Sequence, residues 1–306
     1  MDYSAIIHAD SISEGGNRLT TMEVTFPRMV LAEFNTHRMF SRNSASSRAI
    51  PVKKQIQRVL DSPFIPTYWG RNQSGMQAEE ELTGTAREQA IQEWLIARDY
   101  AVEQVQNLLD LEAHKQLANR LLEPFMWHTV IVTATEWSNF FALRANPMAQ
   151  PEIRTIAEMM QALYDDSKPQ LVKEGEWHLP LIQSNERDGV FEFSEDAQKI
   201  SAARCARVSY LTHDGTRDLQ ADLDLYERLV SGGHMSPLEH VATPLTAKRW
   251  HEKRDMALAD LDYMYTVEGR QVSQVTDFVF SGNFRGWTQL RKLVPDEHDF
   301  SQVEKS

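Results

Sequence analysis

The chain has 306 residues, of which 42% are hydrophobic and 25% are charged, and its net charge at pH 7 is −12. This composition is typical of one or two folded soluble domains and excludes an intrinsically disordered chain. The acidic balance argues against nucleic acid as a partner, because a polyanion would be repelled. No run reaches the ~18 apolar residues that span a bilayer, and the N-terminus has no basic segment followed by an apolar one. We therefore expect a cytoplasmic protein that binds no membrane.

The first third of the chain predicts a strand, a helix, a loop and a second helix. Residues 18–26 alternate in polarity as a strand does, and Pro27 suits the first turn of a helix that runs toward Thr36. Residues 51–84 are rich in Pro, Gly, Asn and Gln, which favours an ordered loop or lid. From Thr85 onward, apolar residues keep helical spacing and predict a core-facing helix.

The remaining chain predicts one buried strand, three helices and a connector. Residues 129–135 are rich in β-branched side chains and predict a strand, while residues 137–144 and 150–164 have helical spacing. We interpret residues 173–194 as a connector between an N-terminal half, 1–172, and a C-terminal half, 195–306. In the second half we expect a helix around residues 223–230, ended by Gly232 and Gly233, and a strand over 275–280.

The single cysteine, Cys205, excludes an intrachain disulfide and a zinc site built from cysteines. Its apolar setting predicts a buried structural thiol and not a nucleophile.

Anion-binding groups are concentrated between Thr36 and Arg48. These thirteen residues include three arginines, a histidine, an asparagine and five hydroxyls, with no acid among them. Guanidinium forks and hydroxyl donors hold phosphate and carbonyl oxygens. A basic surface loop could have the same composition, so composition alone leaves both interpretations open.

The order of these residues resembles the signature of the flavin-dependent thymidylate synthases, which reads Arg-His-Arg, seven residues, Ser. The matching residues are His37, Arg38, Ser41, Asn43, Ser46 and Arg48. Three positions depart from the family pattern. Thr36 replaces the first arginine, Ser44 replaces a glutamate, and Glu33 replaces a glutamine that usually faces the nucleotide.

Two later segments extend the resemblance. Residues 117–124 are similar to the family's Ala-Arg-x-x-Leu-Pro segment, and Arg120 matches the arginine that binds the nucleotide phosphate there. Asn139 and Arg144 match the family's spacing of an asparagine, four residues and an arginine. Each of these arginines could also be an ordinary residue at a helix end.

Other family elements stand in a changed order. Two family elements that precede the arginine motif in the family come last here. They are residues 206–209, Ala-Arg-Val-Ser, and residues 233–240, which end in Glu239 and His240. Residues 281–287 resemble the family's Asn-x-Arg flavin contact, whose counterpart in the first half is Thr133 to Trp137. We infer two related halves that each kept part of one site. His234, Glu239 and His240 could alternatively bind a metal, but their spacing fits no metal motif, and we expect no metal.

The resemblance implies an α+β fold with a mixed sheet flanked by helices, and an enzyme that methylates dUMP at C5 to dTMP. It implies FAD, NADPH and methylenetetrahydrofolate as cofactors and co-substrates, and a homo-oligomer, a tetramer or, given the duplication, a dimer. Arg144 would activate the base. The substrate-binding residues would be Glu33, Thr36, Ser44, Ala45, Ser46, Ser47, Arg48, Arg120 and Arg144. The flavin-binding residues would be His37, Arg38, Ser41, Asn43, Asn139, Ser209, His240, Asn283 and Arg285.

Two alternatives stay open at this stage. The departures at Thr36, Glu33 and Ser44 are compatible with a sister reaction, such as hydroxymethylation of dUMP or modification of dCMP. A glutamate only accepts hydrogen bonds where a glutamine also donates them, which could select another nucleobase edge. Alternatively, the chain is a non-catalytic paralogue that binds flavin or a nucleotide.

Overall fold

The computed structural model describes residues 1–47, 50–183, 195–210, 218–245, 265–267, 270–272, 282–295 and 297. Its first part contains β1 (Ser4–Ser13), β2 (Arg18–Pro27), η1 (Arg28–Val30), α1 (Leu31–Asn35), β3 (Ser41–Ser44), α2 (Val52–Asp61), α3 (Gly84–Asp110), α4 (Lys115–Ala118), η2 (Asn119–Phe125), β4 (Trp127–Ala134), α5 (Ser138–Arg144), α6 (Pro151–Asp166) and β5 (Gln170–Val172). The later part contains α7 (Glu195–Tyr210), α8 (Leu219–Ser231), η3 (Ser236–His240), β6 (Ala242–Pro244), β7 (Tyr265–Val267), β8 (Arg270–Val272), β9 (Trp287–Gln289) and η5 (Leu290–Leu293).

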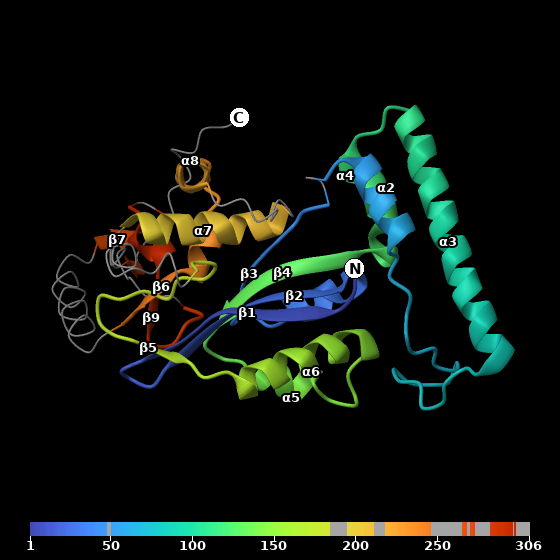
Figure 1. The fold of residues 1–306 in the computed structure, drawn as a ribbon, viewed down its shortest axis with the longest axis horizontal. Coiled ribbons are helices and arrows are strands. Elements are labelled where there is room, and N and C mark those ends of the chain that lie inside the picture. Colours follow the sequence, from blue (N-terminus) through green and yellow to red (C-terminus); the bar gives the residue numbers. More distant parts are fainter. Residues whose placement is uncertain are drawn as a thin grey trace.

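The main sheet has five strands in the order β3-β4-β2-β1-β5. Its first four strands pair antiparallel, whereas β5 runs parallel to β1, so the sheet is mixed. Helices α5 and α6 lie along one face, and α7 lies against the other (Figure 1). The α+β architecture with a mixed sheet flanked by helices, expected from the sequence, is confirmed.

Strand β4 is buried from His128 to Ala134 because helices cover both faces of the sheet. Val130, Val132 and Ala134 join the core formed with α5 and α6. Ile131 points the other way, as the alternation of a strand requires, and it packs with Cys205 of α7. The Cys205 side chain is fully buried, and this burial raises the pKa of its thiol. The prediction of a buried structural cysteine is confirmed.

Strand β1 carries a bulge. Its pairing with β2 joins Ile7 to Met22 and Ala9 to Thr21, so His8 is the extra residue. The His8 ring lies 2.8 Å from the Glu23 carboxylate of the neighbouring strand. A bulge of this kind bends the strand and increases its twist.

Helix α2 corrects one sequence prediction. Residues 51–84 were expected to form a loop, but Val52–Asp61 are helical and only the segment after them is irregular. The helix follows Pro51 and packs Val52, Ile56 and Val59 against the core of η2 and α3. These three side chains have helical spacing, which the high local content of polar residues obscured.

Helix α3 is confirmed, although its expected burial holds only in part. The apolar stripe faces the protein, but Val105 is its one fully buried residue among the described side chains. Tyr100, on the opposite side, is 63% exposed. The helix extends along one end of the molecule, beyond the edge of the sheet (Figure 1).

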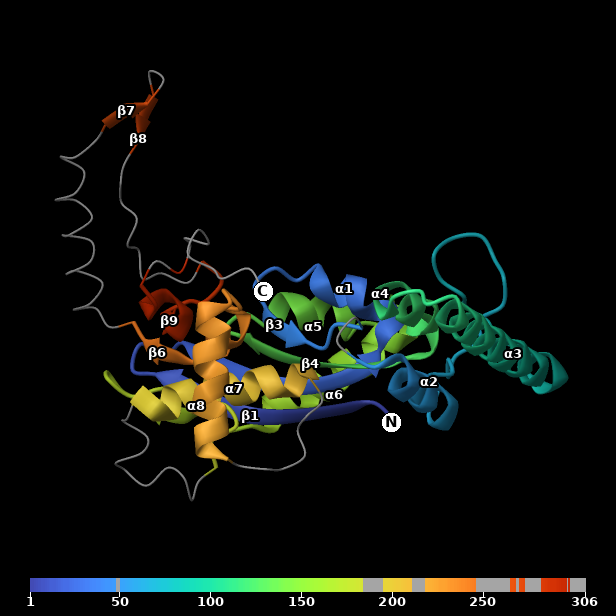
Figure 2. The ribbon, with the colours of Figure 1, turned by 90° about the horizontal axis from the view of Figure 1, so that it is seen from above.

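The second half is organised around α7 and α8, which cross each other (Figure 2). Helix α8 begins at Asp218, whose side chain accepts a hydrogen bond from the backbone N–H of Ala221, and it ends at Gly232 as predicted. Strand β1 and helix α7 were not predicted, and the strand expected at 275–280 lies outside the described residues. No described helix is long and apolar enough to cross a membrane.

Candidate functional site

Arg144, the last residue of α5, is held in place by two residues of the anion-binding segment. Its Nε donates to Nε2 of His37 over 3.2 Å, and its Nη2 donates to Oγ1 of Thr36 over 3.2 Å. The Thr36 hydroxyl in turn donates to the backbone oxygen of Glu33 at 2.7 Å. Thr36, which stands where the family signature has an arginine, therefore positions the guanidinium of Arg144. These contacts leave Nη1 of Arg144 without a hydrogen bond among the described residues.

His37 is buried against aromatic rings, with Phe140 edge-on at a centroid distance of 4.9 Å. Burial, together with the nearby charges of Arg144 and Arg42, lowers the pKa of His37 to about 4. The ring is therefore neutral at pH 7. Since Nε2 accepts from Arg144, the ring proton belongs on Nδ1.

A cavity of about 830 Å³ lies beside this group. Glu33 and Arg144 line it, together with the irregular segment around Tyr68 to Glu79 and with Pro147 to Arg154. This volume is in the range of nucleotide and cofactor pockets. Oε2 of Glu33 is buried and has no hydrogen-bond partner in the described structure, and no ion pair joins Glu33 to Arg144. One wall thus offers both a guanidinium donor and a carboxylate acceptor.

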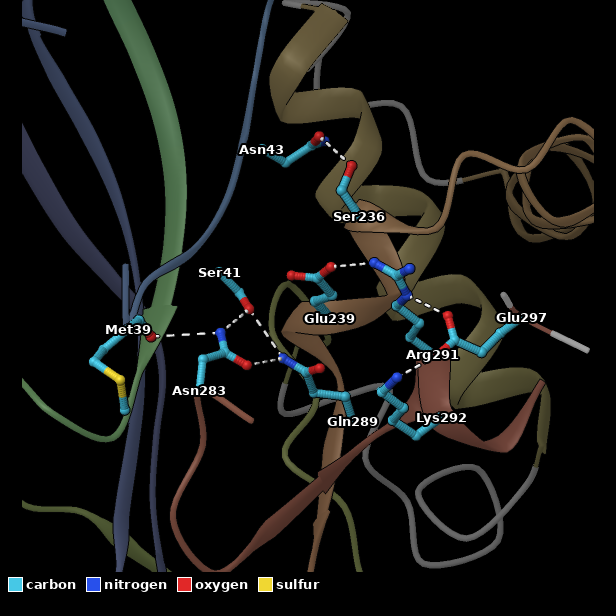
Figure 3. A network of polar contacts seen from close by, with 10 residues as sticks. All are labelled: Met39, Ser41, Asn43, Ser236, Glu239, Asn283, Gln289, Arg291, Lys292 and Glu297. Carbon is cyan, nitrogen blue, oxygen red and sulfur yellow. Dashed lines mark hydrogen bonds and ion pairs between the residues drawn. The ribbon is translucent and has the colours of Figure 1, made fainter. Parts of the chain in front are cut away.

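A second group of predicted residues joins the two halves of the chain (Figure 3). Asn283 donates to the buried hydroxyl of Ser41 at 2.8 Å, and Gln289 donates to the same hydroxyl at 2.9 Å. Ser236 donates to the side-chain oxygen of Asn43 at 3.1 Å. The structure thus brings Asn283 onto the signature segment. Gln289 was missed, and no sequence motif marks it.

A third group lies near α2. Ala45 and Ser47 line a small cavity with Arg28 and Arg58, and none of the residues that line it carries a carboxylate. The hydroxyl of Ser47 is buried without a partner in the described structure. Burial lowers the pKa of the Arg58 guanidinium. The two arginines make these surroundings positive, but the cavity, of about 20 Å³, has room for little more than one water-sized group. Arg58 was missed because residues 51–84 were interpreted as a loop.

Arg120 belongs to the same region. Its guanidinium donates to Glu123 at 2.8 Å, and Glu123 also accepts from Arg28 at 3.3 Å. Glu123 therefore links Arg120 to the wall of the small cavity. The side chain of Arg120 is half exposed, at 51%.

The remaining predicted residues are spread around these groups. Arg38, Asn139 and Ser46 are exposed, and Ser44 is half-buried at the end of β3. Arg285 is 71% exposed and pairs with Glu136 at 3.2 Å. Arg48 and the side chain of Ser209 lie outside the described residues.

His240 is fully buried between the sheet and the second half. Its Nδ1 lies 2.8 Å from Oγ1 of Thr133, whereas its Nε2 is buried without a hydrogen-bond partner in the described structure. Burial lowers the pKa of His240 to about 3, so the ring is neutral. The neighbouring Glu239 pairs with Arg291 at 2.7 Å. Within the described ranges, no group of three residues with metal-binding side chains is placed to hold a metal ion.

Arg144 and Glu33 thus line one cavity, and His37 and Thr36 hold Arg144 beside it. Residues 18–170, half of the chain, match the family of the thymidylate synthase complementing protein. The chain belongs to this family, which classes it with nucleotide-modifying enzymes.

Solved structures with a similar fold include two of the UMP/dUMP methylase PolB from Streptomyces cacaoi, one bound with 5-Br UMP and one with 5-Br dUMP. Each is 18% identical to this chain, with a TM-score of 0.44, and each covers 53% of it. The matches cover 88% and 90% of the respective PolB chains. No curated protein sequence matches the chain.

Proposed function

We propose that the protein methylates dUMP at C5 to give dTMP, in a flavin-dependent reaction that uses methylenetetrahydrofolate and NADPH. The observation that carries this proposal is the position of Arg144, held by a neutral His37 and by Thr36 at a nucleotide-sized cavity. Membership of the thymidylate synthase complementing protein family supports it. Arg144 is the catalytic residue that we propose.

The guanidinium of Arg144 suits a pyrimidine whose ring acquires negative charge during the reaction. It remains protonated, so it stabilises charge on a ring oxygen without giving up its own proton. A protonated His37 would place a second positive charge beside the guanidinium and repel it. Because the lowered pKa keeps His37 neutral, it acts as an acceptor that fixes the direction of Arg144.

Several residues fit FAD, which when bound would supply reducing equivalents from NADPH. The buried Nε2 of His240 lacks a partner and could contact a polar atom of the flavin. The side-chain amide of Asn283 already donates to Ser41, so a flavin contact from Asn283 would use its remaining hydrogen-bonding capacity. His37, Arg38, Asn43, Asn139, Ser209 and Arg285 complete the proposed flavin set.

The phosphate end of the nucleotide would lie against Ser44, Ala45, Ser46, Ser47, Arg48 and Arg120. The arginines beside Ser47, Arg28 and Arg58, support this part of the proposal. Their position on another part of the sheet from Arg144 suggests that one site takes groups from more than one copy of the chain. A homo-oligomer, a tetramer or a dimer, is proposed accordingly, and analytical ultracentrifugation measures it directly.

Glu33 supports the alternative of a sister reaction on dUMP or dCMP. Glu33 lines the same cavity as Arg144, and one of its carboxylate oxygens is buried without a partner in the described structure. It could accept from the N3–H of uracil or from the amino group of cytosine, so the geometry admits either base.

The test is the visible spectrum of the purified protein with FAD, titrated with dUMP and separately with dCMP. We expect a bound-flavin spectrum that dUMP perturbs. A response to dCMP alone would establish the sister reaction, and absence of flavin binding would refute the central proposal. In turnover assays, Arg144→Ala should abolish product formation, and unchanged activity would remove Arg144 from the mechanism.

A further inference from the structure

Residues 69–82, which we call the lid, supply part of the wall of the cavity of about 830 Å³. The two arms of the lid run antiparallel and bond to each other. The backbone N–H of Leu82 donates to the oxygen of Trp69 at 2.7 Å, and the N–H of Arg71 donates to the oxygen of Glu80 at 2.7 Å. The lid is therefore a hairpin that is closed at its base.

Further bonds tie the two arms of the lid together near its tip. The hydroxyl of Tyr68 donates to the backbone oxygen of Ala78 at 2.9 Å, and the side chain of Gln73 donates to the backbone oxygen of Gln77 at 2.8 Å. The arms approach so closely that a Cβ atom added to Gly70 would lie 2.1 Å from the Cβ atom of Ala78. Because these contacts are internal, the lid can turn as one unit without breaking them.

One hydrogen bond joins the lid to the opposite wall of the cavity. Nε2 of Gln77 donates to the backbone oxygen of Met148, in the turn between α5 and α6, at 2.6 Å. Both residues line the cavity, and Figure 1 shows the lid segment, which precedes α3, beside this turn. Among the described residues, no other hydrogen bond or ion pair connects the lid to α5, to α6 or to the turn between them.

Little apolar burial supports the lid in its present position. Residues 70–76 are exposed, and Met76, which lines the cavity, is fully exposed. A segment with few buried contacts opens locally at a much lower free-energy cost than the whole protein unfolds. The bond from Gln77 to Met148 therefore has a large share in keeping the lid closed.

We infer that residues 69–82 are a lid through which a ligand reaches the cavity beside Arg144, and that Gln77 latches this lid against Met148. Lids of this kind shield a reaction from water and control the entry and release of ligands. The inference rests on the proposed function in taking a pyrimidine nucleotide as the ligand. It adds the route of entry and the residue that controls it.

The latch can be tested without any ligand, by the rate at which a bulky maleimide labels Ala149→Cys. Ala149 is half-buried and lines the cavity, so its labelling follows the fraction of time for which the lid is open. The native Cys205 is fully buried, and its labelling reports unfolding of the whole protein. Gln77→Leu should accelerate labelling at position 149 by about fivefold, the effect of one hydrogen bond, and leave Cys205 unchanged.

An unchanged rate at position 149 in folded Gln77→Leu protein overturns the inference, whatever the protein binds. An equal acceleration at Cys205 would also overturn it, because the variant would then loosen the whole fold. The matched control is Gln57→Leu. Gln57 is exposed and bonds only to Asp61 of its own helix among the described residues, so its replacement should change neither rate.

Stopped-flow fluorescence of dUMP binding to the FAD-loaded protein distinguishes a latch from a ligand contact. A latch that forms both with and without the ligand limits entry and release equally. Gln77→Leu should therefore raise the association and dissociation rate constants together, by about fivefold, and leave Kd nearly unchanged. A faster dissociation alone, with weaker binding, would make Gln77 a ligand contact and overturn the latch.

The two experiments separate this inference from the proposed function. If labelling responds to Gln77→Leu as expected but dUMP does not bind, the proposed function fails and the latch stands. If dUMP binds and neither the labelling rate nor the binding rates respond, the latch fails and the proposed function is unaffected.

Discussion

At the scale of single residues, Thr36 orients the guanidinium of Arg144, a role that a threonine in the sequence does not by itself indicate. Its hydroxyl accepts from Arg144 and donates to the backbone of Glu33. Thr36→Val removes both bonds with little change in shape. We expect kcat to fall by about fivefold, since one such bond contributes about 1 kcal/mol. Steady-state assays of Thr36→Val beside Thr36→Ser measure the effect, and equal losses in the two variants would contradict it.

His37 predicts how stability depends on pH. Its pKa is lowered to about 4 in the folded protein, whereas an unfolded histidine titrates near the ordinary value of 6.5. Between these values the unfolded chain binds the proton and the folded chain does not. Stability is therefore complete above about pH 6.5 and is lost as the pH falls toward 4, by on the order of 3 kcal/mol for this group.

Denaturant unfolding between pH 4 and 7 measures this dependence. His37→Asn should reduce the slope over that range without abolishing it, because burial also lowers the pKa values of His128 and His240 to about 3. His114→Asn, at an exposed position, is the control. Equal slopes in the wild type and in His37→Asn would show that His37 is not the group responsible.

At the scale of elements, α7 and α8 are joined by a buried ion pair. Asp222 of α8 is 1% exposed and accepts from Arg204 at 2.9 Å and from Arg207 at 2.7 Å, both on α7. Asp222→Ala would remove the carboxylate that both arginines share inside the protein. We expect a loss of about 3–5 kcal/mol in the free energy of unfolding. Urea denaturation measures it.

The matched control is Arg207→Ala, which removes the more exposed of the two partners and keeps the buried pair. Its loss should be much smaller, because the Arg207 side chain is 26% exposed and Arg204 still neutralises Asp222. A loss as large as that of Asp222→Ala would show that Arg207 carries the interaction.

At the scale of the whole molecule, the sequence predicts local features well and long-range ones poorly. Strands β2 and β4 and helices α5 and α6 follow from hydrophobic periodicity. Strand β1 lacks a clear alternation because the bulge at His8 breaks its period. Helix α7 is hard to recognise because it is buried over much of its surface, so its apolar residues do not form a single stripe.

The site shows the same limit. The signature from His37 to Ser47 and the position of Arg144 could be taken from residue order alone. The contact of Ser41 with Gln289 joins residues 248 positions apart, and no local pattern encodes it.

The contact between the halves yields a prediction for the whole chain. Gln289 donates to both Ser41 and Asn283, at 2.9 and 3.3 Å. Gln289→Leu removes one of the two bonds to Ser41 and leaves Asn283 attached to the signature segment by its own bond to Ser41 alone at that hydroxyl. We expect faster hydrogen exchange of the backbone amides from Trp287 to Leu293 and unchanged exchange in β4.

Gln220→Leu is the control, since Gln220 is exposed and bonds only to Asp224 of its own helix among the described residues. Exchange rates unaltered by Gln289→Leu would show that the second half is held against the sheet by its apolar contacts alone.

The bulge in β1 also makes the chain unevenly tolerant of deletions. Because Ile7 and Ala9 already pair with consecutive residues of β2, a chain that lacks His8 can keep every pair on both sides of that position. Loss of a residue between Ala9 and Ile12 would instead shift the register by one and exchange the two faces of the strand. Natural or engineered length variation within this strand should therefore be concentrated at a single position.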